Sequence, residues 1–140
     1  MLDPAEWEFW DTWMRAQRLL VRELDRGLQR DCGISKAEFS VLMTLTGPMR
    51  VGELADALDW EKSRVAHLLT RMESRGLVAR IEDGVTGRRT GIELTAEGRR
   101  TAENAVRAHG ANVRRLVLDR LTPDQAAAIR TWSEQLIDQS

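Results

Sequence analysis

Basic residues are concentrated in one stretch of this 140-residue chain. From Lys62 to Gly91 there are seven Lys or Arg residues and three Asp or Glu residues, a net charge of +4, whereas the rest of the chain carries −5. The total charge of −1 by itself argues against a nucleic-acid partner. A local basic surface in an acidic protein is nevertheless typical of a site that contacts phosphate groups. The chemistry that this stretch offers is the binding of a polyanion.

The residues from 62 to 75 predict a helix with one buried and one exposed face. Apolar residues recur there at helical spacing: Val65, Leu68, Leu69 and Met72. The opposite face then presents small, hydroxyl and basic side chains: Ser63, Arg64, Ala66, His67, Thr70, Arg71 and Ser74. Because that face carries no carboxylate, it suits the major groove of duplex DNA. We expect Arg64 to pair with a guanine edge, whereas His67 is equally compatible with a base contact and with an ordinary surface position.

Further polar residues are predicted to contact the DNA backbone. Lys62, Ser63 and Arg71 suit phosphate contacts, aided by the N–H groups at the helix N-terminus. Arg88 and Arg89 follow a predicted hairpin tip and would reach the backbone or the adjacent minor groove. The complete set of predicted DNA-binding residues is Lys62, Ser63, Arg64, His67, Thr70, Arg71, Arg88 and Arg89.

The elements around this helix predict a winged helix-turn-helix. We expect a short helix capped by Gly52, a tight turn at residues 59–61, the helix of residues 62–75, and strands at 77–82 and 89–94. Gly76 is expected in the left-handed conformation that ends a helix. A fold that is mainly α with a small β-hairpin follows.

The chain ends predict helices that associate with a second copy of the chain. A long helix with three Trp residues spans residues 4 to about 33, and Thr95 and Thr122 begin two later helices. This apolar surface exceeds what one small core covers, which favours a homodimer. We expect residues 1–140 to form one domain, with dimerisation helices at 1–33 and 99–140 and a winged-helix DNA-binding lobe at 34–98.

Several motifs together resemble the MarR family of bacterial regulators: the run from Val51 to Leu58, the segment from Lys62 to Val65, the segment from Arg71 to Val78, and Leu94-Thr95-Ala96-Glu97-Gly98. The resemblance implies a homodimeric transcriptional regulator, a repressor, on a pseudo-palindromic operator of double-stranded DNA with half-sites roughly 34 Å apart. It also implies that a small aromatic ligand binds between the dimerisation helices and the lobe and weakens DNA binding. Trp13 and Trp60 are candidates for that pocket, although Trp at helical spacing is more often core or interface.

One position departs from the family pattern. The wing of this family commonly reads Asp-x-Arg, and the corresponding residues here are Thr86-Gly87-Arg88. The Arg is kept, but Thr86 cannot form the ion pair that braces the wing. Asp83, three residues away, is a candidate substitute.

Other function classes fit the sequence less well. The two histidines, His67 and His109, fall on different predicted helices, and no nucleophile triad or phosphate-binding Gly loop is present, so we expect no enzyme activity and no cofactor. The lone Cys32 lacks a partner for a redox or metal site. The alternative is a winged-helix module that binds a protein instead of DNA. With no apolar run of membrane length and an acidic N-terminus, we expect a cytoplasmic protein without membrane contact.

Overall fold

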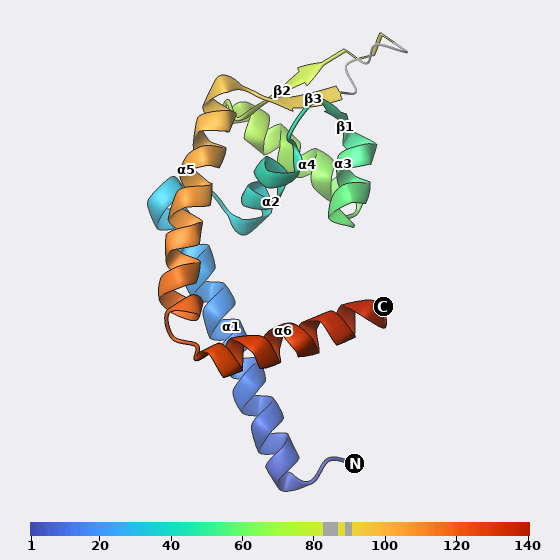
Figure 1. The fold of residues 1–140 in the computed structure, drawn as a ribbon. Coiled ribbons are helices and arrows are strands. Elements are labelled where there is room, and N and C mark those ends of the chain that lie inside the picture. The colour runs from blue at the N-terminus through green and yellow to red at the C-terminus, as the bar shows by residue number, and fades with distance from the viewer. Residues whose placement is uncertain (83–86, 89–90) are drawn as a thin grey trace. The chain divides into compact units, whose positions relative to one another are not determined.

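The computed structural model describes residues 1–82, 87–88 and 91–140. Along the chain the elements are α1 (Pro4–Cys32), α2 (Lys36–Thr44), β1 (Met49–Arg50), α3 (Val51–Leu58), α4 (Lys62–Ser74), β2 (Val78–Ile81), β3 (Gly91–Leu94), α5 (Ala96–Val113), the π-helical turn η1 (Arg114–Leu118) and α6 (Pro123–Asp138) (Figure 1). The predicted mainly α fold with a winged helix-turn-helix is confirmed. None of the helices described is both long and apolar enough to cross a membrane.

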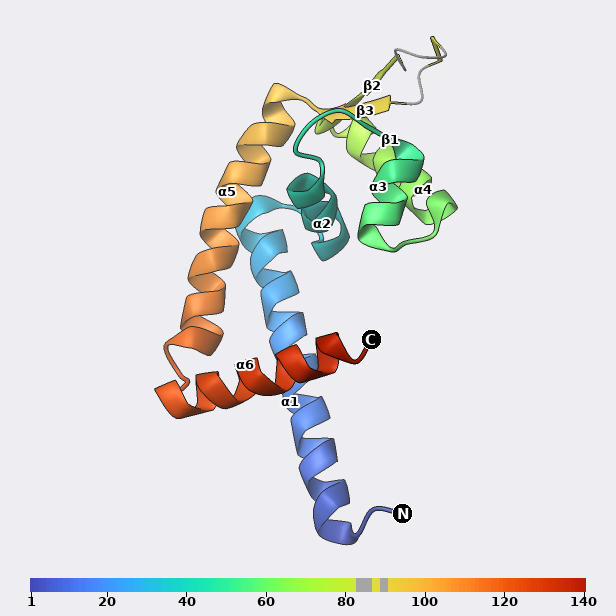
Figure 2. The ribbon, with the colours of Figure 1, turned by 45° about the vertical axis from the view of Figure 1, so that its right-hand side comes forward.

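The described residues divide into two compact units, which we call the central unit and the terminal unit. The central unit comprises residues 25–108, and the terminal unit comprises residues 1–24 and 109–140. Helices α1 and α5, which Figure 2 shows as continuous ribbons, each contribute residues to both units.

The central unit is built around a continuous hydrophobic core. The buried apolar side chains are Leu28, Ile34, Val41, Leu42, Leu45, Leu54, Ala55, Val65, Leu68, Leu69, Met72, Leu77, Val78, Ile92 and Ala105. They come from every helix of the central unit and from two strands, so α4 is fixed from several sides.

The sheet has one strand more than the predicted hairpin. Strand β3 lies between β1 and β2 and pairs antiparallel with both, with Met49 opposite Ile92 and Val78 opposite Leu94. The sequence predicted only the two strands at 77–82 and 89–94. Two residues cannot form a stable strand alone, so this pairing depends on the tertiary approach of residues 49–50 to β3.

Local signals at helix ends predict most element boundaries. Ser35 and Glu38 form a capping box at the start of α2, and Thr122 and Gln125 form another at the start of α6. The expected cap at Gly52 is wrong. Helix α3 begins earlier because Arg50 is its N-cap residue, and the Glu53 carboxylate accepts a hydrogen bond from the Arg50 N–H at 3.1 Å.

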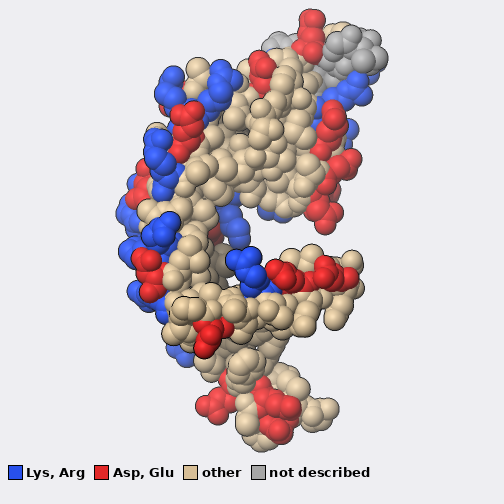
Figure 3. Space-filling view, viewed as in Figure 1, with Lys and Arg blue, Asp and Glu red and all other residues tan. Residues whose placement is uncertain are grey.

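Charged side chains of both signs line α5 in the face shown in Figure 3. Arg100 donates to Glu97 at 2.6 Å one turn away, and both side chains are exposed. Such mixed charge is typical of a solvent-exposed helix face.

Candidate nucleic-acid interface

Helix α4 separates its residues into a buried and an exposed face, as the spacing predicts. Its four apolar residues are at most 3% exposed, and they pack into the central core. The six predicted DNA-binding residues on α4 are all exposed: Lys62, Ser63, Arg64, His67, Thr70 and Arg71. The structure therefore brings these six side chains to the accessible surface of one well-anchored helix.

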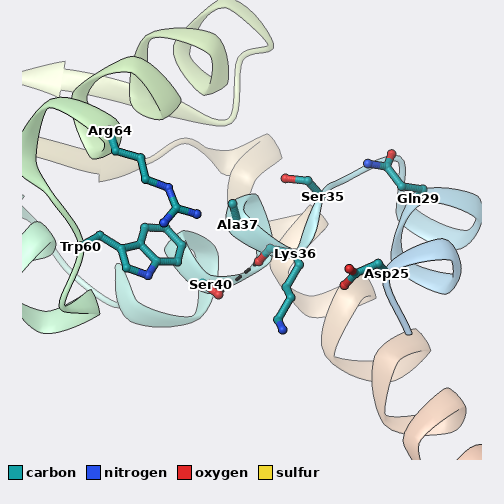
Figure 4. Close-up of a pocket in the computed structure, with 8 residues that line it drawn as sticks. All are labelled: Asp25, Gln29, Ser35, Lys36, Ala37, Ser40, Trp60 and Arg64. Carbon is teal, nitrogen blue, oxygen red and sulfur yellow. Dashed lines mark hydrogen bonds between the residues drawn. The ribbon is translucent and has the colours of Figure 1, made fainter. Parts of the chain in front are cut away.

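The side chain of Arg64 lies over the ring of Trp60. The guanidinium carbon is 4.4 Å from the ring centroid, a cation–π contact (Figure 4). Trp60 is itself held in the turn before α4, because its N–H donates to the carbonyl of Ala55 at 3.0 Å and its side chain packs against the core. The residue expected to read a base is thus positioned by the preceding turn.

A carboxylate that the prediction did not consider stands at the start of α4. Glu61 is the N-cap residue, and its Oε1 accepts a hydrogen bond from the Ser63 hydroxyl at 2.7 Å. A second carboxylate, that of Glu73, is also exposed on α4, although the sequence predicted an exposed face free of carboxylates. The sequence could have indicated the Glu61 carboxylate, because this residue directly precedes Lys62.

The hydroxyl of Thr70 has partners within the protein. It donates to the Ala66 carbonyl at 3.0 Å and lies 3.2 Å from Nη2 of Arg80, which donates to it. Arg80, on β2, also lies 3.6 Å from the Glu73 carboxylate. The Arg80 side chain therefore joins the wing strand to α4, a contact that sequence reasoning missed because it links residues of two elements.

The end of α4 is locked by two hydrogen bonds of a Schellman motif. Gly76, with a φ of 75°, donates to Glu73, and Leu77 donates to Met72. The next helix is joined to this point, since the Thr95 N–H donates to the Leu77 carbonyl at 3.1 Å and the Thr95 hydroxyl accepts from Gly98. A Cβ on Gly98 would lie 2.0 Å from the Leu77 carbonyl oxygen. The end of α4 and the start of α5, which are separate motifs in the sequence, are thus packed directly against each other.

Arg75 connects the end of α4 to the junction of α1 and α2. Its guanidinium forms an ion pair with the largely buried Glu38 carboxylate at 2.5 Å and donates to the Gly33 carbonyl. Glu38 is also the residue that caps α2 together with Ser35. The orientation of α4 in the central unit is therefore tied to the start of α2.

The structure describes only one of the two predicted wing residues. Arg88 is exposed at a bend, where it is accessible to solvent. Arg89 lies outside the described residues, as do Thr86 and Asp83, on which the expectation about wing bracing depends.

A pocket of about 550 Å³ lies within the central unit beside the start of α4 (Figure 4). Its lining residues are Asp25, Gln29, Ser35, Lys36, Ala37, Ser40, Trp60 and Arg64. Trp60, one of the two predicted pocket tryptophans, is among them. Trp13 belongs instead to an aromatic cluster of the terminal unit, where it packs edge-on against Trp132 with a centroid distance of 5.0 Å.

Cys32 is half-buried at the end of α1. Burial, and secondarily the neighbouring Asp31 carboxylate, raises the pKa of its thiol. A raised pKa leaves little of the reactive thiolate near neutral pH. Across the parts of the chain that are described, no group of three His, Cys, Asp or Glu side chains converges on a possible metal site.

Comparison with solved structures gives bacterial transcriptional regulators. The chain is similar to AbsC, a MarR family transcriptional regulator from Streptomyces coelicolor, with a TM-score of 0.83 and 30% identity over 99% of this chain and 96% of AbsC. It is also similar to a second MarR family regulator from that organism, solved in complex with DNA, with a TM-score of 0.84 and 30% identity over 99% of this chain and 89% of the other.

Sequence comparisons agree with these structures. A family model described as the sugar-specific transcriptional regulator TrmB matches residues 28–90. The transcriptional regulator HosA of Escherichia coli is 32% identical over 75 residues, which cover 52% of this chain. That match spans 56% of the length of HosA, little more than half of this relative.

Proposed function

The chain belongs to the MarR family of transcriptional regulators, and on that premise we propose that it is a homodimeric repressor that binds a pseudo-palindromic operator in duplex DNA. The observation that carries this proposal is the exposed face of α4. Its residues from Ser63 to Arg71 are small, polar or basic, and the opposite face is anchored in the core.

The roles of the α4 residues follow from their positions on the helix. Arg64 and His67 lie near the N-terminal end, which reaches base edges when a recognition helix enters the major groove. Lys62 and Arg71 bind phosphates with their side chains, and Ser63 does so with its backbone N–H, because its hydroxyl already donates to Glu61. Thr70 mainly positions the wing strand through Arg80, because its hydroxyl already has partners. The DNA complex of the relative at 30% identity supports this use of the fold.

Arg88 extends the proposed DNA surface to the wing. It is exposed and next to the basic Arg89, so the pair suits the backbone or a narrow minor groove. The wing therefore adds phosphate contacts to the base contacts of α4.

The apolar surface of the terminal unit supports the proposed homodimer. Phe9 is 68% exposed, Trp132 46%, Leu136 50% and Ile137 70%. Apolar surface of this kind marks association sites on soluble proteins. A second copy of the chain would cover these residues and place two α4 helices on one face of the DNA, which is the arrangement that a pseudo-palindrome requires.

The pocket beside α4 supports control by a small ligand. The Trp60 ring offers an aromatic surface there, and the Arg64 side chain lies over that ring. A small aromatic ligand in this pocket would compete with Arg64 for the Trp60 ring and change the position of a DNA-reading side chain. Release of DNA would follow, and Trp fluorescence would report the ligand.

The experiment that tests DNA binding is selection of bound fragments from a random duplex pool, followed by affinity measurements at increasing salt. We expect two related half-sites about one helical turn apart and an affinity that falls steeply with salt. Arg64→Ala is expected to lose about 1–3 kcal/mol of discrimination at one base position. Arg120→Ala, at an exposed basic residue of the terminal unit, is the matched control.

The result that contradicts DNA binding is equally specific. If Arg64→Ala and Arg88→Ala leave the affinity unchanged across the salt range, the proposal is wrong. A pulled-down protein partner with no selected duplex would instead favour the interaction module.

A further inference from the structure

Glu61 begins α4 without a side-chain cap, so its local structural role is limited to the favourable interaction of its charge with the helix dipole. It is the N-cap residue of α4, yet its side chain makes no capping hydrogen bond to the helix backbone. Its carboxylate instead accepts the hydrogen of the Ser63 hydroxyl at 2.7 Å, and both residues are exposed. Replacing Glu61 would therefore remove no hydrogen bond to the helix N-terminus.

The charge of Glu61 opposes the proposed use of this surface. A carboxylate at the end of a helix that approaches DNA is repelled by phosphates, which weakens binding to any duplex. Glu73, the carboxylate within α4, lies 3.6 Å from the Arg80 guanidinium, whereas Glu61 has a neutral hydroxyl as its hydrogen-bond partner. The charged carboxylate of Glu61 therefore lies at the N-terminal end of α4, the same end as Arg64 and His67.

We propose that Glu61 is a specificity-determining residue that accepts a hydrogen bond from the amino group of a cytosine in the major groove. This inference rests on the proposed DNA-binding function. Glutamate pairs with cytosine N4 because that amino group is a donor on a base edge. Where guanine or thymine stands at the position, only acceptors face the carboxylate, which loses water without gaining a donor, and the complex is weakened. Adenine offers its N6 amino group beside the acceptor N7, so it is rejected less strongly than guanine or thymine.

Ser63 is the positioning residue for this contact. Its hydroxyl holds one carboxylate oxygen and restricts the rotamers of Glu61, which leaves the second oxygen for the base. Ser63 thus has a role besides a phosphate contact.

The test compares base preferences of the full chain and its Glu61→Gln variant, selected from the same random duplex pool. We expect Glu61→Gln to bind unrelated duplex about three- to tenfold more tightly, since a charge facing phosphates is removed. At one position of each half-site, the preference for cytosine should fall about tenfold. Glu103→Gln, the same charge change at an exposed residue of α5, is the control and should alter neither quantity.

Ser63→Ala separates the charge from its orientation. This variant keeps the Glu61 charge, so the cytosine preference should fall while the affinity for unrelated duplex does not rise. If Glu61→Gln leaves both quantities unchanged while Arg64→Ala weakens discrimination, the role of Glu61 is wrong and DNA binding stands. If the unaltered chain selects no duplex, both proposals are wrong.

Discussion

The central and terminal units bury their apolar side chains to very different extents. Every apolar residue that is buried in the described structure lies between Leu28 and Ala105, within the central unit. Among the residues that the structure describes, the exposed large apolar ones, apart from Val106, belong to the terminal unit: Met1, Leu2, Trp7, Phe9, Trp10, Leu19, Val21, Leu118, Ile129, Trp132, Leu136 and Ile137.

This difference separates two sources of stability. Burying a large apolar side chain contributes roughly 1.5–3 kcal/mol, so the central unit is stabilised by its own chain. The terminal unit gains much less stability from burial within one chain. Its exposed apolar residues would contribute such stability only when a partner covers them. The comparison agrees with the proposal that a second copy of the chain completes the terminal unit.

The largest expected effect contrasts two leucines. Leu69 is completely buried, so Leu69→Ala should destabilise the central unit by about 2–5 kcal/mol at every protein concentration. Leu136 is 50% exposed, so Leu136→Ala should lower the melting temperature only where the chain associates. Thermal unfolding across a hundredfold range of concentration checks both, and equal, concentration-independent losses would contradict the difference between the units.

A second contrast uses two glycines of helix α5. A Cβ at Gly98 would clash with the Leu77 backbone, so Gly98→Ala should destabilise the chain by about 2 kcal/mol. Gly110 has no neighbouring atom within 4 Å of such a Cβ, and Gly110→Ala should stabilise the helix by about 0.5–1 kcal/mol. Urea unfolding measures both changes. Destabilisation by Gly110→Ala would mean that a partner packs closely on that part of α5.

A smaller effect is expected at the ion pair that ties α4 to α2. Glu38→Gln should cost about 1–2 kcal/mol, because the carboxylate is largely buried although its Arg75 partner is half-exposed. Glu97→Gln, which breaks an exposed pair with Arg100, should cost a few tenths of a kcal/mol or nothing. Chemical denaturation measures the two losses, and similar values would show that burial of Glu38 adds no stability.

The smallest effect concerns Cys32 at the end of α1. Because its pKa is raised, the folded thiol should react with iodoacetamide more slowly than the unfolded thiol at the same pH. The unfolded thiol loses its proton first as pH rises above the ordinary value of 9.0, so stability should fall slightly above that pH and be unaffected below it. A reaction rate equal to that of the unfolded chain would contradict burial at this position.

The amino-acid sequence alone determined the features that depend on neighbouring residues. Capping at Ser35 and Thr122, the stop at Gly76 and the two faces of α4 each follow from side chains within a few positions of one another. Such interactions act over one or two helical turns, so they are visible as spacing. The family resemblance rests on the same local motifs.

Only the tertiary structure decided the contacts between distant elements. The pairing of Arg75 with Glu38, the contact of Arg80 with Thr70, and the pairing of β1 with β3 join residues at least ten positions apart. Even the nearby placement of Arg64 over Trp60 depends on the packing of the Trp60 ring against the core. The residue types permit many such pairings, and the packing of the core selects one set by fixing which elements meet.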